Sequence, residues 1–134
     1  MNEITAVSES PKRRNRVLAV EDDPDVIESF RVLLELIGND VRAVPDGPSA
    51  LDAAREFHPN IAFVDVDLPG MNGYEVAERL RREYGRQIRL FALTGFGQPA
   101  DRERALKAGF DLHLVKPIDL GFLQKLLNDD TTPL

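Results

Sequence analysis

Residues 61–70 read IAFVDVDLPG, an apolar run that ends in two aspartates and a Pro-Gly turn. Four apolar residues bounded by turn signals are typical of a strand that is buried on both faces. A carboxylate at the end of such a strand costs free energy unless it is paired. Because side chains alternate along a strand, Asp65 and Asp67 share a side if the strand continues that far. We therefore interpret Asp65 as a functional residue at the end of a buried strand.

Other apolar runs accompany this one along the chain. They lie at residues 17–20, 41–44, 88–93 and 112–115. Between and after the runs, apolar residues recur at helical spacing. The helices predicted in this way span residues 26–37, 50–57, 76–84, 99–108 and 120–127, of which 99–108 has the weakest pattern. Strands that alternate with helices through short connections indicate an α/β domain with a parallel sheet covered on both faces.

The strand order follows from the runs that are least apolar. Arg42 and His113 interrupt the second and fifth runs, so we expect these two strands at the edges of the sheet. The sequence therefore predicts an α/β fold with a doubly wound, five-stranded parallel sheet in the order 2-1-3-4-5. In such a sheet, ligands bind beyond the carboxyl ends of the strands, where the winding reverses between the first and third strands.

The composition restricts the function further. The 134 residues carry a net charge of −6, which disfavours broad binding to the phosphate backbone of nucleic acid. The chain has no cysteine, and so neither disulfides nor thiolate metal sites. No stretch is apolar enough for a signal peptide or a membrane span, so we expect a cytoplasmic protein without membrane contact. Residues 1–15 are interpreted as a flexible lead-in, 16–128 as the domain and 129–134 as a tail.

Acidic residues follow the first strand. The run Glu21-Asp22-Asp23-Pro24 fits a helix start in which Asp23 is the N-cap and Pro24 takes the first helical position. This interpretation explains one acid of the three. Neighbouring carboxylates repel one another, and a bound cation, most simply Mg²⁺, offsets the repulsion. A helix start and a magnesium site are thus both compatible with this run.

The residues at the other strand ends suggest phosphoryl transfer. A carboxylate such as Asp65 attacks phosphorus to form an acyl phosphate, and a divalent cation screens the repulsion between the two anions. Thr94 ends the fourth strand, either as an ordinary β-former or as a donor to a phosphoryl oxygen. Lys116 follows the fifth strand, where its ammonium either reaches water or faces the carboxylates as an ion pair or phosphate clamp.

One motif suggests a different function. Residues 95–100 read GFGQPA and match the G-x-G-x-x-A fingerprint of dinucleotide-binding folds. The match follows the fourth strand instead of the first, and the helix after it is short and weakly apolar. We therefore interpret these glycines as part of a mobile loop.

The motifs together resemble a known family. The runs EDDP at 21–24, FVDVDLPGMNGYEVA at 63–77, ALTGFG at 92–97 and LVKPID at 114–119 resemble the receiver domain of two-component response regulators. The resemblance covers residues 16–128, and the sequences of these motifs are most similar to those of receivers of hybrid sensor kinases. It implies a flavodoxin-like fold and a signalling switch that catalyses only its own phosphoryl transfer and dephosphorylation, rather than an enzyme.

The resemblance also implies a role for each residue. Asp65 would be the phosphoacceptor, taking a phosphoryl group from a histidine kinase or a histidine phosphotransfer protein. Asp23 would bind Mg²⁺ directly and Asp22 largely through water, with the backbone carbonyl of Asp67 completing the protein's share. Thr94 and Lys116 would hold the phosphoryl oxygens, and the Lys116–Pro117 bond would be cis. Glu21 is interpreted as a bystander.

The same family suggests how the signal leaves the site. Movement of Thr94 toward the phosphoryl group would vacate space beside the fifth strand, which family members fill with Tyr or Phe at the position of His113. We hypothesise that this histidine makes the switch respond to pH between about 6 and 8. Phe96 is expected to slow attacking water. We expect a partner protein on the surface formed by the fourth helix, fifth strand and fifth helix, and a monomer or weak dimer.

Two other functions compete with this interpretation. The stretch Asp65-Val66-Asp67 also resembles the nucleophile motif of haloacid dehalogenase phosphohydrolases, but that family places its metal-binding acids late in the chain. Turnover of a phosphate ester would favour it. The second is an interaction module that has lost phosphorylation, against which the intact set of acids, threonine and lysine argues. Labelling by a small acyl phosphate distinguishes both from a receiver.

Overall fold

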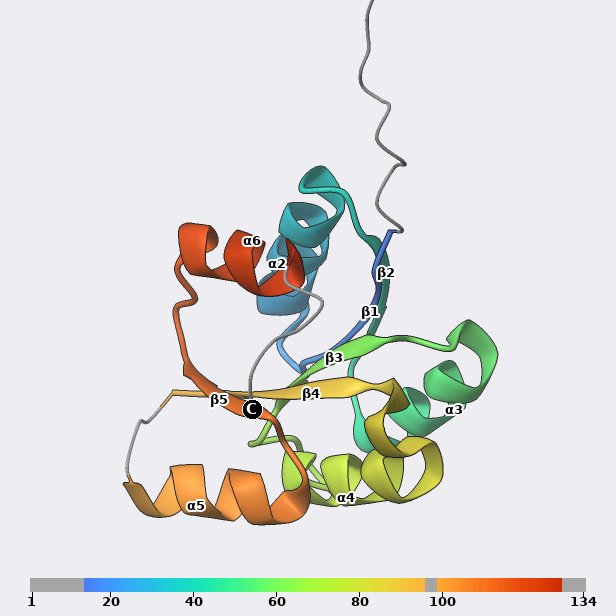
Figure 1. Ribbon diagram of the computed structural model, residues 1–134, viewed down its shortest axis with the longest axis vertical. Helices are drawn as coiled ribbons and strands as arrows, with labels where there is room; N and C mark the ends of the chain where they lie inside the picture. The colour runs from blue at the N-terminus through green and yellow to red at the C-terminus, as the bar shows by residue number, and fades with distance from the viewer. Residues whose placement is uncertain (1–13, 96–98, 129–134) are drawn as a thin grey trace, which may run out of the picture.

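The computed structural model describes residues 14–95 and 99–128 and shows strands and helices in strict alternation (Figure 1). The strands are β1 (Arg16–Val20), β2 (Asp40–Val44), β3 (Ile61–Asp65), β4 (Arg89–Thr94) and β5 (Leu112–Val115). The helices are α2 (Pro24–Leu36), α3 (Gly47–Phe57), α4 (Gly73–Tyr84), the short 3₁₀ helix η1 (Gly85–Gln87), α5 (Pro99–Ala108) and α6 (Leu120–Asn128). The pattern agrees with the predicted elements, except that η1 was not predicted.

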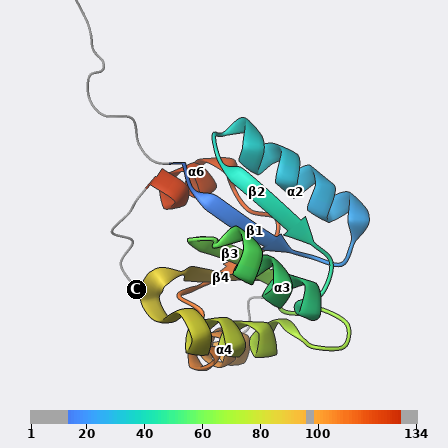
Figure 2. The ribbon, with the colours of Figure 1, turned by 90° about the vertical axis from the view of Figure 1, so that its right-hand side faces the viewer.

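All five strands are parallel and lie in the order β2-β1-β3-β4-β5, which confirms the prediction. Figures 1 and 2 show α2 and α6 on one face of the sheet and α3, α4 and α5 on the other. Every residue of β3 is buried, as expected for a strand with a neighbour on each side and helices above and below. The winding reverses between β1 and β3, so a ligand site is expected there.

Side chains that alternate along the strands belong to two apolar clusters, one on each face of the sheet. Leu18, Ala62, Val64 and Leu90 face α3, α4 and α5, whereas their sequence neighbours face α2 and α6. On the α2 side the ring of Phe63 lies 5.2 Å from Phe30, edge to face, and 5.2 Å from Phe91, centroid to centroid in both cases. The sheet is therefore anchored from both sides and holds the carboxyl ends of its strands in fixed register.

The helices begin where capping residues stand. Asp23 caps α2, Asp46 caps α3 and Asn72 caps α4, each accepting hydrogen bonds from backbone N–H groups of the first turn. Pro24 in the first turn of α2 also agrees with the sequence analysis. Only two residues of helix α5, Ala105 and Ala108, are buried, which agrees with its weak apolar pattern. Within the described residues, no helix has the length and apolar character needed to cross a membrane.

The guanidinium group of Arg81 connects α4 to the segments that precede β4 and β5. Arg81 donates to the carbonyl oxygens of Gly109 at 2.7 Å and Ile88 at 2.8 Å, and to the Asp111 carboxylate at 2.9 Å. The side chain of Asp111 is 6% exposed and also accepts from the backbone N–H of Leu90 at 2.8 Å. The network satisfies backbone groups that α4, β4 and α5 would otherwise leave unpaired.

We expect the variant Arg81→Ala to lose about 3 kcal/mol of unfolding free energy, because it leaves a buried carboxylate and several carbonyls without their donor. Urea unfolding followed by circular dichroism measures the change. Arg82→Ala, an exposed arginine on the same helix, is the matched control and should change the free energy by less than about 0.5 kcal/mol. Equal losses in the two variants would contradict the structural role of Arg81.

Candidate functional site

The residues of the candidate site lie together at the carboxyl ends of the parallel strands. Asp65 is the last residue of β3 and Thr94 the last of β4, while Glu21 and Lys116 directly follow β1 and β5. Parallel strands end at the same edge, and the structure accordingly places Asp65, Thr94 and Lys116 where the sequence analysis expected them. The chain between β5 and α6 contains the cis Lys116–Pro117 bond, also as expected.

Asp65 is buried, with 5% of its surface exposed, and both of its carboxylate oxygens are engaged. Its Oδ1 accepts from the backbone N–H of Asp67 at 2.9 Å, and its Oδ2 accepts from the Lys116 ammonium at 3.2 Å. A buried carboxylate needs such donors to remain charged. The strand end therefore holds a carboxylate that two donors orient.

The Lys116 ammonium also donates to Oε1 of Glu21 at 2.6 Å, and Glu21 is itself 5% exposed. Burial alone would lower the pKa of Lys116, but the hydrogen bond that its ammonium donates to Glu21 and the charge of Asp65 raise the pKa above its ordinary value. Burial raises the pKa of Glu21, with the Asp65 charge adding to this effect and the Lys116 and Asp23 donors opposing it. One cation thus serves two buried anions, which leaves the site with an excess of negative charge.

Three carboxylates form a group that could hold a metal ion. Glu21, Asp22 and Asp65 each offer one oxygen, and these oxygens lie within 4.8 Å of one another. Asp22 is exposed, whereas the other two are buried. An all-oxygen donor set with surplus negative charge suits a hard divalent cation such as Mg²⁺. The residues of the site therefore fit the magnesium ion that the sequence analysis expected.

The membership of this group differs from the sequence analysis in two respects. Glu21, interpreted there as a bystander, is a buried member of the group, so that interpretation was wrong. Asp23, expected to bind Mg²⁺ directly, lies outside it: its Oδ1 accepts from the backbone N–H groups of Asp25 at 3.0 Å and Val26 at 3.3 Å as the N-cap of α2. The capping interpretation of Asp23 is the one that the structure supports.

A sequence signal for Glu21 was present. Val20 pairs with Val64 in the β1–β3 register, so the next residues along, Glu21 and Asp65, emerge side by side. The backbone N–H of Glu21 still bonds to Val44 of β2 at 3.1 Å, which continues the strand pattern past Val20. In each strand an acid follows four apolar residues, and the first acid after each run, Glu21 or Asp65, is a buried member of the group.

Close backbone packing fixes the loop after Asp65. The N–H of Gly73 donates to the Val66 carbonyl at 3.2 Å, and a Cβ at Gly73 would lie 2.4 Å from the Asp65 carbonyl oxygen. Only glycine permits this approach. The Asp67 residue, whose carbonyl the family resemblance assigns to the metal, belongs to the same loop. Gly73 therefore sets how close α4 stands to the candidate site.

His113 lies in β5, and its ring Nε2 is buried with no hydrogen-bond partner among the described residues. Burial lowers the pKa of the imidazole below its ordinary value, with the charge of Arg102 adding to this effect and that of Asp101 opposing it. The titration of His113 therefore shifts in the acid direction from its ordinary value, toward the lower end of the range between about pH 6 and 8 that we hypothesised. Phe96 lies outside the described residues, as do Gly97 and Gln98 of the dinucleotide-like motif.

We expect Gly73→Ala to lower the unfolding free energy by about 2 kcal/mol, since the new methyl group meets backbone that has no room to move aside. The same variant should weaken Mg²⁺ binding, because the loop after Asp65 must shift. Urea unfolding and calorimetric titration with Mg²⁺ measure the two effects. Gly95→Ala, at a glycine with no heavy atom within 4 Å of an added Cβ, is the control and should leave both close to wild type.

The depressed pKa of His113 has a consequence for stability. The unfolded chain takes up a proton near pH 6.5 and the folded chain only at lower pH, so stability falls as the pH drops from about 7 to 5. In His113→Phe this component disappears, and the unfolding free energy should depend less on pH across that interval. Urea unfolding at pH 7.5 and 5.5 tests this, with His58→Asn at an exposed site as control. A pH dependence identical in wild type and His113→Phe would reject the assignment.

Comparison with known proteins shows which family this chain is similar to. A model of the response regulator receiver domain family matches residues 17–128. The DNA-binding response regulator MtrA of Mycolicibacterium smegmatis is 36% identical over 104 residues, which are 78% of this chain and 45% of MtrA. An uncharacterized 14.6 kDa protein of Leptolyngbya boryana is 36% identical over 77% of this chain and 79% of its own. The chain thus spans less than half the length of MtrA.

Solved structures show the same fold. The chemotaxis protein CheY4 of Vibrio cholerae superposes with a TM-score of 0.80 at 27% identity, covering 86% of this chain and 97% of CheY4. The receiver domain of sensor histidine kinase PA1611 from Pseudomonas aeruginosa PAO1, solved with a magnesium ion in its active site cleft, has a TM-score of 0.77 at 32% identity, covering 86% of this chain and 95% of that one. The fold is CheY-like and flavodoxin-like. On these matches, the chain belongs to the response regulator receiver domain family of two-component systems.

Proposed function

We propose that this chain is a phosphoacceptor receiver in which Asp65 takes a phosphoryl group from a histidine kinase or a histidine phosphotransfer protein. The observation that carries the proposal is the environment of Asp65: a buried carboxylate, oriented by two donors, beside two further acids. A structural carboxylate needs the donors but not the additional acids, whose repulsion costs free energy. Residues 16–128 form the receiver in this proposal.

Glu21, Asp22 and Asp65 would hold Mg²⁺ together with the carbonyl of Asp67. The PA1611 receiver, 32% identical, holds magnesium in its cleft, which supports this assignment. When bound, the ion would neutralise negative charge that otherwise repels an incoming phosphoryl group. Asp23 would act only as the cap of α2.

In the proposed transfer, a carboxylate oxygen of Asp65 forms a bond to phosphorus while the bond from phosphorus to the donor histidine nitrogen breaks. The freed nitrogen takes a proton, and Asp65 becomes an acyl phosphate. Lys116 already lies 3.2 Å from Asp65, and the third N–H of its ammonium is available for a phosphoryl oxygen. Thr94, whose backbone carbonyl accepts from Lys116 N–H at 2.8 Å, would offer its hydroxyl to another. Such a transfer needs positioning and charge neutralisation above all.

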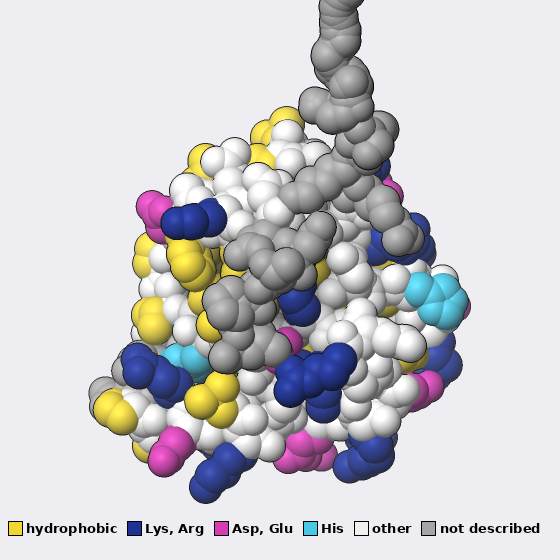
Figure 3. Space-filling view, viewed as in Figure 1, with side chains coloured by type: hydrophobic (Ala, Val, Ile, Leu, Met, Phe, Trp, Pro, Cys, Tyr) yellow, Lys and Arg dark blue, Asp and Glu magenta, His cyan; other side chains and the backbone are white. Residues whose placement is uncertain are grey.

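The phosphorylated domain would act as a switch and not as an enzyme with turnover of external substrates. We propose that a cytoplasmic partner protein reads it at α5, β5 and α6, with the chain a monomer or weak dimer. Large apolar side chains are exposed there, at Leu106, Val115, Leu120 and Phe122. Figure 3 shows apolar side chains among charged ones on this side of the molecule, the mixture typical of a transient protein interface.

Incubation with acetyl phosphate and Mg²⁺ tests the proposal. Intact-mass spectrometry should detect the addition of one phosphoryl group, which Asp65→Asn abolishes and chelation of Mg²⁺ prevents. Lys116→Met should slow labelling by about 100-fold, since removal of one charge-stabilising donor typically costs that much. Labelling that persists in Asp65→Asn, or steady turnover of a phosphate ester, would refute the receiver assignment.

A paired substitution tests which acids bind the metal. Asp22→Asn should weaken Mg²⁺ binding at least tenfold, as measured by calorimetric titration, because it removes one of three anionic ligands. Asp23→Asn should leave the affinity within about twofold of wild type, since asparagine caps a helix as well as aspartate does. Loss of binding in Asp23→Asn alone would restore the assignment made from the sequence.

A further inference from the structure

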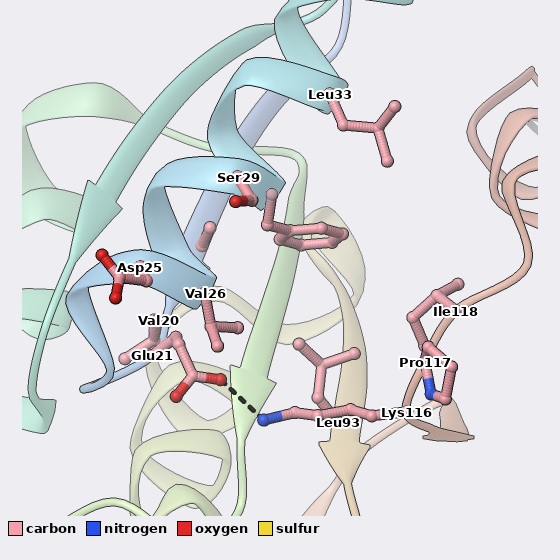
Figure 4. Close-up of a pocket in the computed structure, with 12 residues that line it drawn as sticks. Val20, Glu21, Asp25, Val26, Ser29, Leu33, Leu93, Lys116, Pro117 and Ile118 are labelled. Carbon is pink, nitrogen blue, oxygen red and sulfur yellow. Dashed lines mark hydrogen bonds and ion pairs between the residues drawn. The ribbon is translucent and has the colours of Figure 1, made fainter.

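Two kinds of contact hold the surroundings of the acidic group. Toward α2 and the β5–α6 segment, an apolar cavity of about 600 Å³ ends at Glu21 and Lys116, which are joined by the 2.6 Å ion pair drawn in Figure 4. The other carboxylate oxygen of Glu21 accepts from the backbone N–H of Asp23 at 3.2 Å. Charged and polar groups therefore fix this side. The loop of residues 66–72, which follows Asp65, depends instead on apolar contacts.

Met71 connects this loop to α3. Val66 and Leu68 are buried in the core, with 4% and 5% of their surface exposed, and the partly buried Met71 packs against the same apolar cluster. The thioether also lies against the first residue of α3, because a Cβ added at Gly47 would be 2.9 Å from the Met71 Sδ. Figure 2 shows the loop passing beside α3. Gly47 and Met71 thus form one closely fitted contact.

The sulfur in this contact is sensitive to oxidants. Met71 is partly exposed to solvent, and the chain has no cysteine thiolate that would react with an oxidant first. Oxidation converts the apolar thioether into a larger, polar sulfoxide, and a buried polar oxygen costs free energy unless it finds a donor. The side of the sulfur that contacts Gly47 has no room for this oxygen. A sulfoxide at residue 71 therefore no longer fits against α3.

We propose that Met71 is an oxidation site through which hydrogen peroxide releases the loop after Asp65 from α3 and weakens the metal site. The sulfur lone pair attacks one peroxide oxygen, and the O–O bond breaks. The proton on the transferred oxygen passes to the departing oxygen, which leaves as water. Sulfur loses two electrons and the peroxide gains two. A thiol-dependent sulfoxide reductase would reverse the change.

The effect on the metal rests on the proposed function, in which the carbonyl of Asp67 binds Mg²⁺. Asp67 lies between Asp65 and Met71 in the same loop. Gly73 fixes the far end of the loop against the backbone of Asp65, so the contact of Met71 with α3 is the part of its path that oxidation can change. Displacement of a metal ligand by a shift of its supporting shell lowers metal affinity.

Treatment of the ¹⁵N-labelled chain with hydrogen peroxide at neutral pH tests the proposal. Trypsin separates the two methionines, because Met1 falls in peptide 1–12 and Met71 in peptide 56–79, and mass spectrometry measures the sulfoxide in each. We expect Met71 to become oxidised, amide shifts in residues 46–50 and 66–73, and at least threefold weaker Mg²⁺ binding by calorimetric titration. Methionine sulfoxide reductases A and B with dithiothreitol should restore both. Unchanged shifts in these residues after oxidation of Met71 would overturn the proposal.

Two variants separate the chemistry of the sulfur from the packing of the side chain. Met71→Leu keeps an apolar side chain of similar volume, so it should bind Mg²⁺ within about twofold of wild type and keep that affinity after peroxide treatment. It also controls for oxidation of Met1, which both chains contain. Met71→Gln places a polar side chain of similar length at the contact and should weaken Mg²⁺ binding at least threefold without oxidant. Equal losses in peroxide-treated wild type and Met71→Leu would contradict the role of Met71.

The close fit at Gly47 gives an independent test. In Gly47→Ala the new methyl group displaces the flexible Met71 side chain toward solvent, so peroxide should oxidise Met71 at least twofold faster than in wild type while Met1 reacts at its usual rate. Gly95→Ala, at a glycine with open space around an added Cβ, is the control and should leave both rates unchanged. The same Met71 rate in wild type and Gly47→Ala would show that the contact does not protect the sulfur and would overturn the proposal.

These measurements separate the inference from the receiver function. Peptide mapping and amide shifts need neither metal nor phosphodonor, so they decide whether oxidation releases the loop even if Asp65 accepts no phosphoryl group. An untreated chain that binds no Mg²⁺ would refute the metal assignment of the proposed function. Where untreated wild type is labelled by acetyl phosphate, the oxidised chain should be labelled at least threefold more slowly at subsaturating Mg²⁺. An unchanged rate would contradict the coupling between Met71 and the metal site.

Discussion

The ammonium of Lys116, lying between the buried carboxylates of Glu21 and Asp65, is the contact on which the site depends. The three residues follow or end strands β5, β1 and β3, and the ammonium must extend across the end of β4 to reach its partners. Lysine suits this task because it carries a compact charge on a long, flexible stem. Removing it would leave two carboxylates buried without compensation, which costs far more than the pair itself contributes. Strand β5 lies two strands from β3, and the ion pairs of Lys116 connect these two strands in addition to the packing of the sheet.

The rigidity of the surrounding backbone gives this contact its precision. The N–H of Lys116 donates to the Thr94 carbonyl, so the lysine starts from a fixed point on β4. Gly73 brings the first turn of α4 against the backbone of Asp65, and the loop between them has one path. Two strand ends and one helix end therefore hold the carboxylate and its donors independently of any bound ion. Such preorganisation is what a loose phosphoryl-transfer transition state requires of a protein.

The sequence was sufficient for the fold and for most of the site, because periodicity and edge position are local properties. Arg42 and His113 marked the edge strands correctly, and Asp65, Thr94 and Lys116 followed from the strand ends. The acids after β1 were harder, since EDDP offers three candidates and the choice rests on register with a distant strand. The acid directly after each run of four apolar residues was a signal for Glu21, and the pairing of Val20 with Val64 shows that it lies beside Asp65, while Asp23 caps α2. The cavity beside Lys116 was beyond prediction, because it arises from the separation of α2 and the β5–α6 segment and not from a motif.

The two sides of the acidic group differ in their contact with water. Asp22 and Asp67 are exposed on one side, whereas on the other the apolar walls around Val26 and Leu93 border Glu21 and Lys116. Charge interactions are weak toward water and stronger toward an apolar wall. A cation entering from the wet side therefore meets the carboxylates at low desolvation cost, while a change of charge on Asp65 acts most strongly through Lys116. Because Pro117 and Ile118 follow that lysine and lead into α6, a change of charge at the site acts on the packing of the fold through this apolar side.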